Sequence, residues 1–264
     1  MVSIEVEFQN KKEHVLRGNL RYVEKENKIP VVIVLHDYEY HCEHEFIINI
    51  SNHLMDRGFV VFRFDFHGHG QSEGEMKEFN ITQQVDDLIS AVDYLEKLDF
   101  TDGSRIGIYG HGMGADVALI GAGDDARIKN LILHAARADL FEHITSRFSN
   151  DELSELNKKG FVTHVKHGRI EKEFFEHLKK YDLMAEISQL KIPILFVHGK
   201  NDFRVSEENS RRLYSVANEP KRLEIFENAD HEFRDETIRS EMFEIVGDWF
   251  SHWLSEDRRY SYKY

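Results

Sequence analysis

Two segments at the start of the chain alternate apolar and polar residues, 3–8 and 15–23, and this alternation predicts an antiparallel hairpin. Beyond them, Pro30 precedes a continuous apolar run over 31–35, which is typical of a strand buried on both faces of a parallel sheet. Further short apolar runs predict strands at 60–66, 105–109, 128–134, 192–197 and 222–226. Strand positions therefore recur along most of the chain.

Apolar residues at helical spacing occupy the intervals between these strands. They predict helices at 46–54, 85–95, 113–120, 207–216 and 236–254. Strand and helix thus alternate, which specifies an α/β protein with a mostly parallel central sheet of about eight strands and helices on both faces. Ligand sites in such sheets lie beyond the carboxyl ends of the strands, so functional residues are expected in the loops there.

One interval breaks this alternation. The charged stretch 141–189 lies between two expected strands and far exceeds an ordinary connection of ~2–6 residues. We predict that it forms a small cap, and that 1–140 and 190–264 form the core. Inside the cap, the pattern indicates a polar helix near 151–159, a hairpin across 161–169 and a helix near 172–180.

The composition narrows the range of partners and compartments. The 264 residues include 48 acidic and 34 basic side chains, a formal charge of −14 that argues against nucleic acid or an anionic membrane as partner. Cys42 is the single cysteine, which excludes an intrachain disulfide framework and fits a reducing compartment. The chain has no apolar run of ~18–20 residues and its N-terminal segment lacks a signal peptide's apolar stretch. We expect a cytoplasmic protein and leave homodimerisation open.

Three loops after expected strands carry the candidate chemistry. The segment 110–114, with sequence GHGMG, joins a strand to a helix, which is the context of a G-x-S-x-G nucleophile elbow. Asp202 lies in the loop after the strand at 192–197, and His231 follows the last strand. Another loop, at 65–74, has the sequence DFHGHGQSEG.

This ordered set of motifs resembles the α/β-hydrolase superfamily, and within it small esterases of the cinnamoyl/feruloyl esterase and acylglycerol lipase type. The loop at 65–74 is similar to their D-x-x-G-H-G-x-S-x-G motif, and His36 stands where they have an H-G pair. The resemblance implies an α/β-hydrolase fold and a carboxylesterase-type hydrolase without a cofactor, acting on small acyl or aryl esters. It further implies His231 as base, Asp202 as the acid that orients it, and backbone N–H groups of Tyr38 and Met113 as the oxyanion hole.

The sequence departs from this family where the serine nucleophile should be. Gly112 has no side chain, so the acyl-enzyme route cannot run there. Asp37 follows His36 in place of a glycine, and Ala115 follows Gly114 where a further glycine is common. If the Asp37 side chain faced the pocket, its charge would oppose a developing oxyanion. Glycine in a strained elbow also relieves the cost that a side chain would bear there.

Two further functions therefore stand beside an esterase that is impaired or inactive as it is. The first is a pseudoenzyme whose capped pocket binds a small ester, apolar or carboxylate ligand. The second is a serine-independent enzyme in which the His231–Asp202 pair acts as general base.

Other candidates for a nucleophile or a metal site are weaker. His111 occupies the variable elbow position, whose side chain normally points away from the nucleophile. Cys42 is more simply a small buried hydrophobe, and Ser72 a residue that shapes its loop. The densest histidine clusters, at 41–44 and 67–69, lack the spacing of a zinc site, so we expect no metal.

Overall fold

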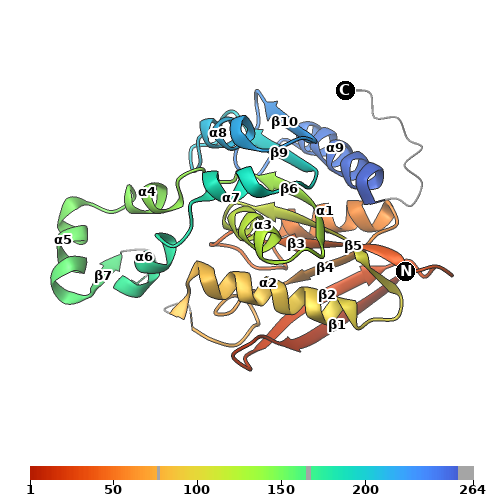
Figure 1. Cartoon of the computed structure of the whole chain (residues 1–264), viewed down its shortest axis with the longest axis horizontal. Helices are drawn as coiled ribbons and strands as arrows, with labels where there is room; N and C mark the ends of the chain where they lie inside the picture. The colour runs from red at the N-terminus through yellow and green to blue at the C-terminus, as the bar shows by residue number, and fades with distance from the viewer. Residues whose placement is uncertain (76–77, 165–167, 255–264) are drawn as a thin grey trace.

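A mostly parallel sheet forms the centre of the molecule in the computed structural model, which describes residues 1–75, 78–164 and 168–254 (Figure 1). Its eight strands have the order β1-β2-β4-β3-β5-β6-β9-β10. The contacts β1 with β2 and β2 with β4 are antiparallel, and the others are parallel. The strands are β1 (Val2–Gln9), β2 (Val15–Tyr22), β3 (Ile29–Leu35), β4 (Val60–Phe64), β5 (Thr101–His111), β6 (Ile128–His134), β9 (Ile194–Gly199) and β10 (Lys221–Phe226).

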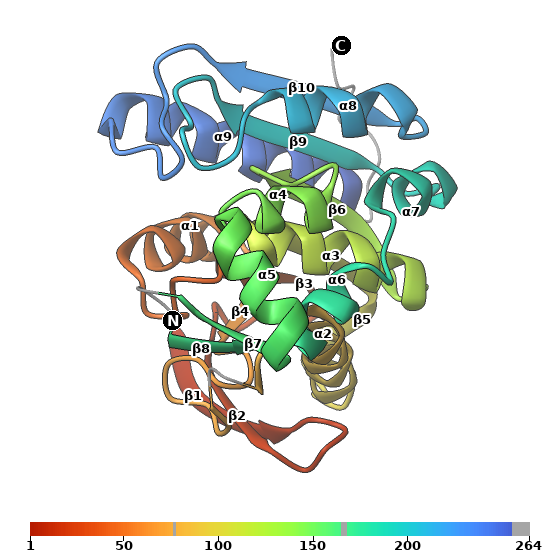
Figure 2. The ribbon, with the colours of Figure 1, turned by 90° about the vertical axis from the view of Figure 1, so that its left-hand side faces the viewer.

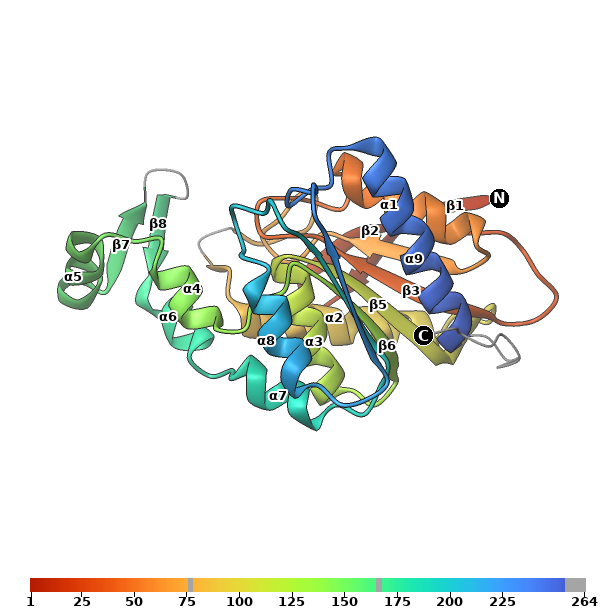
Figure 3. The same cartoon turned by 90° about the horizontal axis from the view of Figure 1, so that it is seen from above.

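Helices cover both faces of this sheet, and β3 shows why its sequence is apolar throughout (Figure 3). Val31 and Ile33 belong to the core under α2 (Ile81–Glu96) and α3 (Met113–Asp124). Val32 and Val34 belong to the opposite core, under α1 (Glu45–Asp56) and α9 (Glu236–Leu254). Successive side chains of a strand point to opposite faces, so a strand covered on both sides needs apolar residues at every position.

Part of the interval 141–189 projects from the core (Figures 1 and 2). The projecting elements are α4 (Leu140–Thr145), α5 (Asn150–Lys159), the antiparallel strands β7 (Phe161–His164) and β8 (Gly168–Glu171), and α6 (Lys172–Leu178). Ser149 and Glu152 form a capping box at the start of α5, which satisfies two N–H groups there. The last helix of the interval, α7 (Leu183–Gln189), packs against α3 and α8 (Glu208–Val216) of the core.

Within the three described ranges, the structure has no helix long and apolar enough to cross a bilayer. The loops that follow β3, β5, β6, β9 and β10 meet at one edge of the sheet, because these five strands are parallel. Asp37, Gly112, Asp202 and His231 lie after β3, β5, β9 and β10 at this edge.

Candidate active site

The chain turns sharply at Gly112, between the end of β5 at His111 and the start of α3 at Met113. Gly112 has φ 56° and ψ −118°, a backbone conformation that is costly for any residue with a side chain. Its N–H donates to the carbonyl oxygen of His134 at 2.9 Å. Gly114 is equally constrained, because a Cβ there would lie 2.6 Å from the carbonyl oxygen of Leu35. The elbow therefore keeps its geometry without a nucleophilic side chain.

The Asp37 side chain occupies the space that a serine side chain at position 112 would enter. A Cβ added to Gly112 would lie 2.3 Å from the Asp37 carboxyl carbon, far inside van der Waals contact. The Met113 N–H donates to Asp37 Oδ1 at 2.6 Å. This N–H is one of the two predicted oxyanion donors, and in this structure Asp37 itself takes it. The carboxyl group is buried and lines the cavity described below.

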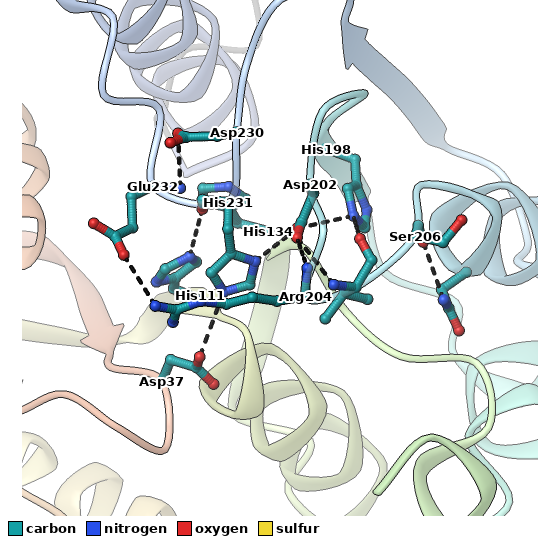
Figure 4. Close-up of polar contacts among 12 residues, drawn as sticks. Asp37, His111, His134, His198, Asp202, Arg204, Ser206, Asp230, His231 and Glu232 are labelled. Atoms are coloured by element: carbon teal, nitrogen blue, oxygen red, sulfur yellow. Dashed lines mark hydrogen bonds and ion pairs between the residues drawn. The ribbon is translucent and has the colours of Figure 1, made fainter. Parts of the chain in front are cut away.

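His231 lies between two carboxylates (Figure 4). Its Nδ1 is 2.6 Å from Asp202 Oδ2, and its Nε2 is 3.4 Å from Asp37 Oδ2. The loop after β9 fixes Asp202, because the N–H groups of Arg204 and Val205 donate to its Oδ1 at 2.8 and 2.9 Å. The structure thus brings His231, Asp202 and Gly112 together as predicted from chain order, while their catalytic roles stay predictions.

The electrostatics of this arrangement favour the charged form of all three groups. Burial lowers the pKa of His231, but its hydrogen bonds and charge interactions with Asp202 and Asp37 outweigh burial and raise the pKa above its ordinary value. Burial raises the pKa of Asp37, but the hydrogen bond from His231 and the charges of Arg137 and His231 bring it well below its ordinary value. Hydrogen bonds from His198 and His231 likewise outweigh burial and lower the pKa of Asp202. These directions favour an imidazolium between two carboxylates.

Arg137 and Asp116 form a buried ion pair beside Asp37, and neither residue belongs to the motifs found in the sequence. Arg137 Nη1 donates to Asp116 Oδ2 at 2.6 Å, and Arg137 Nη2 lies 3.8 Å from Asp37 Oδ1. Both side chains are buried, and burial raises the pKa of Asp116 to about 6. The one sequence signal was that Arg137 follows the carboxyl end of a predicted parallel strand, β6, where sites form.

His36 and His111, the two histidines predicted to line the pocket, form hydrogen bonds with the backbone of its loops. His111 Nε2 donates to the carbonyl oxygen of His231 at 2.9 Å, and the two rings lie 4.6 Å apart. His36 Nδ1 donates to the carbonyl oxygen of Asp37 at 2.8 Å, and its Nε2 accepts from the Phe66 N–H at 3.3 Å. Both rings are fully buried, so they hold the backbone of Asp37 and His231 in place.

The surroundings of the alternative nucleophiles, Cys42 and Ser72, favour a structural role for both. Cys42 is buried, and burial together with the charge of Asp65 raises the pKa of its thiol, which keeps it uncharged. Ser72 Oγ donates to the carbonyl oxygen of Asp65 at 2.5 Å and accepts from the Arg17 N–H at 2.9 Å, so it braces its loop. Among the residues that the structure describes, no group of His, Cys, Asp and Glu side chains is arranged to hold a metal ion.

A cavity of about 570 Å³ opens above Asp37, a volume that suits a small organic ligand. Tyr38 and Met113 line it from the core, and Ile144, Phe148, Ile170 and Phe174 from the cap. Three arginines also line it: Arg137, Arg147 and Arg204. The cap thus contributes most of the apolar wall, and the loops of the sheet contribute the reactive groups.

The doubly wound sheet, the elbow, and the acid and histidine that follow it in chain order define an α/β-hydrolase. Residues 45–257 match the prolyl oligopeptidase family, and the chain belongs to this family. Over 254 residues it is 26% identical to an uncharacterized 31.7 kDa protein of the traX-finO intergenic region of Escherichia coli, covering 82% of this chain and 85% of the relative.

Solved structures confirm the predicted fold and the resemblance to α/β-hydrolases. Est1E from Butyrivibrio proteoclasticus, solved with ferulic acid bound, has a TM-score of 0.83 at 20% identity and covers 94% of this chain and 99% of its own. The esterase domain of a Rhodothermus marinus protein has a TM-score of 0.74 at 24% identity, covering 97% of this chain and 100% of its own. Esterase-like proteins are therefore among the structural neighbours of this chain.

Proposed function

We propose that this protein is a serine-independent hydrolase in which Asp37 takes the place of the missing serine and His231 and Asp202 form the acid–base pair. The observation that carries this proposal is the position of the Asp37 carboxylate, which fills the space beside Gly112 and accepts from the Met113 N–H. A carboxylate is an established type of protein nucleophile, and unlike serine it needs no base to activate it. The lowered pKa of Asp37 keeps it ionised at neutral pH.

The chemistry of a carboxylate excludes the ester route and favours a different electrophile. Attack on an ester carbonyl would give an anhydride, which is more reactive than the ester itself. Attack on a saturated carbon that bears a leaving group gives a stable alkyl ester instead. In that step Asp37 Oδ2 forms a bond to the carbon, and the bond to the leaving group breaks and its electron pair departs with that group. Oδ2 is suited to this because its contact with His231 Nε2 is long, at 3.4 Å, whereas Oδ1 accepts from the Met113 N–H at 2.6 Å.

The second step returns the enzyme to its resting state. Esterification removes the negative charge of Asp37, which takes away one of the interactions that raise the pKa of His231, so the imidazolium can release its proton. Neutral His231 then accepts a proton from water while the water oxygen attacks the carboxyl carbon of Asp37. The Met113 N–H already contacts Oδ1, where the negative charge of the tetrahedral intermediate develops. As the bond between the carboxyl carbon and the alcohol oxygen breaks, His231 gives that oxygen the proton it took from water. The proton that remains on the regenerated carboxyl group of Asp37 passes to His231 and restores the imidazolium, while the proton released after the first step leaves with the departed group as its acid.

A ligand-binding protein without catalytic activity is the second candidate. One observation favours it: the Met113 N–H, which a carbonyl substrate would need, is occupied by Asp37. In this alternative, hydrolysis of small acyl or aryl esters is an ancestral activity that Gly112 and Asp37 have ended.

Covalent labelling distinguishes the two candidates. Incubation of the His231→Gln variant, which lacks the base of the second step, with a neutral alkylating probe, 1-bromo-3-phenylpropane, should leave one phenylpropyl group on the protein, and peptide mapping by mass spectrometry should place it on Asp37. The Asp37→Asn/His231→Gln double variant keeps the side-chain shape at position 37 and should remain unlabelled. Absence of label, labelling at other residues only, or equal labelling of both proteins would contradict the proposal and favour the binding protein.

A further inference from the structure

We infer that the cavity selects a small amphipathic anion, a carboxylate with an apolar body, and that Arg147 of the cap binds the carboxylate. This inference rests on the proposed function in that it names the class of substrate for the same site. Its physical basis is separate, however, because it concerns the part of the cavity wall that the cap contributes. The binding that it predicts requires no reaction at Asp37.

The three arginines that line the cavity differ in how their charges are compensated. Arg137 is paired with Asp116 at 2.6 Å and lies near Asp37. Arg204 lies 3.4 Å from Glu232 and 3.7 Å from Glu39. Arg147 has no carboxylate within 4.0 Å among the described side chains. Among the described residues it is the cavity cation without an ion pair, and Asp37 and Glu39 act on it only at longer range.

Neutral acceptors hold the Arg147 guanidinium in place. Its Nη2 donates to His143 Nε2 at 3.2 Å and to the carbonyl oxygen of Arg204 at 3.2 Å. Burial and the charges of Arg137 and Arg147 lower the pKa of His143 to about 3, so the ring stays uncharged and can accept this hydrogen bond. The remaining N–H groups of Arg147 are left for a ligand, and a guanidinium can bind a carboxylate through two parallel hydrogen bonds.

The rest of the cavity suits an apolar body. Ile144, Phe148, Ile170 and Phe174 line the cap side, and Phe203 lies at the rim with 98% of its surface exposed. Such exposure of a large aromatic side chain beside a cavity leaves apolar surface that a ligand can cover.

The charge of Asp37 fixes the orientation of such a ligand. A carboxylate is repelled from Asp37 and attracted to Arg147, so the opposite end of the molecule is the end presented to Asp37. The whole chain carries a formal charge of −14, which disfavours the approach of anions in general. A local cation without a counter-charge is therefore needed for anion selection at this site.

The test compares two unreactive ligands of the same shape, 3-phenylpropanoate and the neutral 3-phenylpropanamide, by isothermal titration calorimetry. Wild type should bind the carboxylate about tenfold more tightly than the amide, a typical gain from one charged hydrogen-bonded contact. The Arg147→Gln variant should lose this preference while its affinity for the amide is unchanged. Arg211→Gln, which removes a surface arginine of α8 paired with Glu207 outside the cavity, should behave as wild type.

Equal affinity of wild type for the two ligands, absence of binding of both, or a preference that survives Arg147→Gln would overturn the inference. Unchanged amide affinity in Arg147→Gln shows that the variant is folded. Because neither ligand can alkylate Asp37, a failure of the labelling experiment would leave this result intact, and a failure here would leave the role of Asp37 to be decided by labelling.

Discussion

The base of the cavity and its cap differ in how their charged groups are stabilised. The base consists of Asp37 and Arg137, which line the cavity, together with their charged neighbours outside the lining, Asp116, Asp202 and His231. Every side chain of this group is buried and has a partner of opposite charge at 2.6–3.8 Å. In the cap, Arg147 is held by a neutral imidazole and a carbonyl oxygen. Removing a charge at the base is therefore expected to lower both stability and activity. Removing the charge of Arg147 in the cap is expected to change ligand binding. The first prediction concerns the base of the cavity and places a serine at position 112.

Gly112→Ser alone should not create an esterase, because the new Cβ would lie 2.3 Å from the Asp37 carboxyl carbon in a backbone conformation with φ 56°. The double variant Asp37→Gly/Gly112→Ser removes that obstacle and frees the Met113 N–H. We expect it to hydrolyse p-nitrophenyl acetate at least ~10³-fold faster than either single variant, since loss of one triad residue costs about 10⁴–10⁶-fold in well-studied serine proteases. Adding His231→Ala to the double variant should abolish the gain, and a Gly112→Ser single variant as active as the double one would refute this account of Asp37.

The same substitution at two arginines measures the contrast directly. Arg137→Met leaves the buried carboxylates of Asp116 and Asp37 without their cation, which should lower the free energy of unfolding by about 3–5 kcal/mol. Arg147→Met removes no ion pair and should change it by less than about 0.5 kcal/mol. Urea unfolding of both variants gives the two values. Equal losses would mean that the base and the cap are not distinguished by charge burial.

The pH dependence of stability should reveal the imidazolium between its carboxylates. The folded pKa of His231 is raised, so its stabilising contribution is complete below about 6.5, its unfolded value, and is lost as the pH rises through the higher folded value. His231→Gln should therefore lower the free energy of unfolding most at a pH below about 6.5. The loss should become progressively smaller as the pH rises above that value. NMR titration of the ring should also show a lower pKa for His231 in Asp37→Asn, because one of the raising partners loses its charge. An unchanged pKa would mean that Asp37 does not interact with His231.

The smallest effect on stability is expected for Phe203→Ala at the rim. The ring is 98% exposed, so its removal should change the free energy of unfolding by less than about 0.5 kcal/mol. Calorimetric titration should nevertheless show weaker binding of 3-phenylpropanoate, because the ligand loses apolar contact at the mouth of the cavity. A stability loss comparable with that of Arg137→Met would place Phe203 in the core instead.

Sequence patterns predicted the fold well where both faces of an element are buried. The apolar runs at 31–35 and 131–133 lie in β3 and β6, because two covering layers leave no position there for a polar alternation. The strand predicted at 105–109 extends over Thr101–His111 in the structure. Its first residues pair across a register shift, next to Ile106, that apolar periodicity does not encode.

The candidate site could be predicted in part for a similar reason. Chain order and strand ends indicated that His231, Asp202 and the elbow meet, because parallel strands bring their carboxyl ends to one edge. The sequence did not reveal that the Asp37 carboxyl fills the serine space, since this depends on the direction of one side chain after β3. Nor could it reveal the Arg137–Asp116 pair or the position of Arg147, which depend on contacts between separate loops and the fold of the cap.

A single turnover of 1-bromo-3-phenylpropane by the wild-type protein in water enriched in ¹⁸O shows whether Asp37 reacts as a nucleophile. If water attacks the carboxyl carbon, the peptide that contains Asp37 gains one ¹⁸O atom and the released 3-phenylpropan-1-ol carries none. If the label appears only in the alcohol, water has attacked the alkyl carbon, and the carboxyl group is not regenerated by the chemistry proposed for His231. The proposed role of Asp37 requires ¹⁸O in the Asp37 peptide, and ¹⁸O found only in the alcohol would refute it.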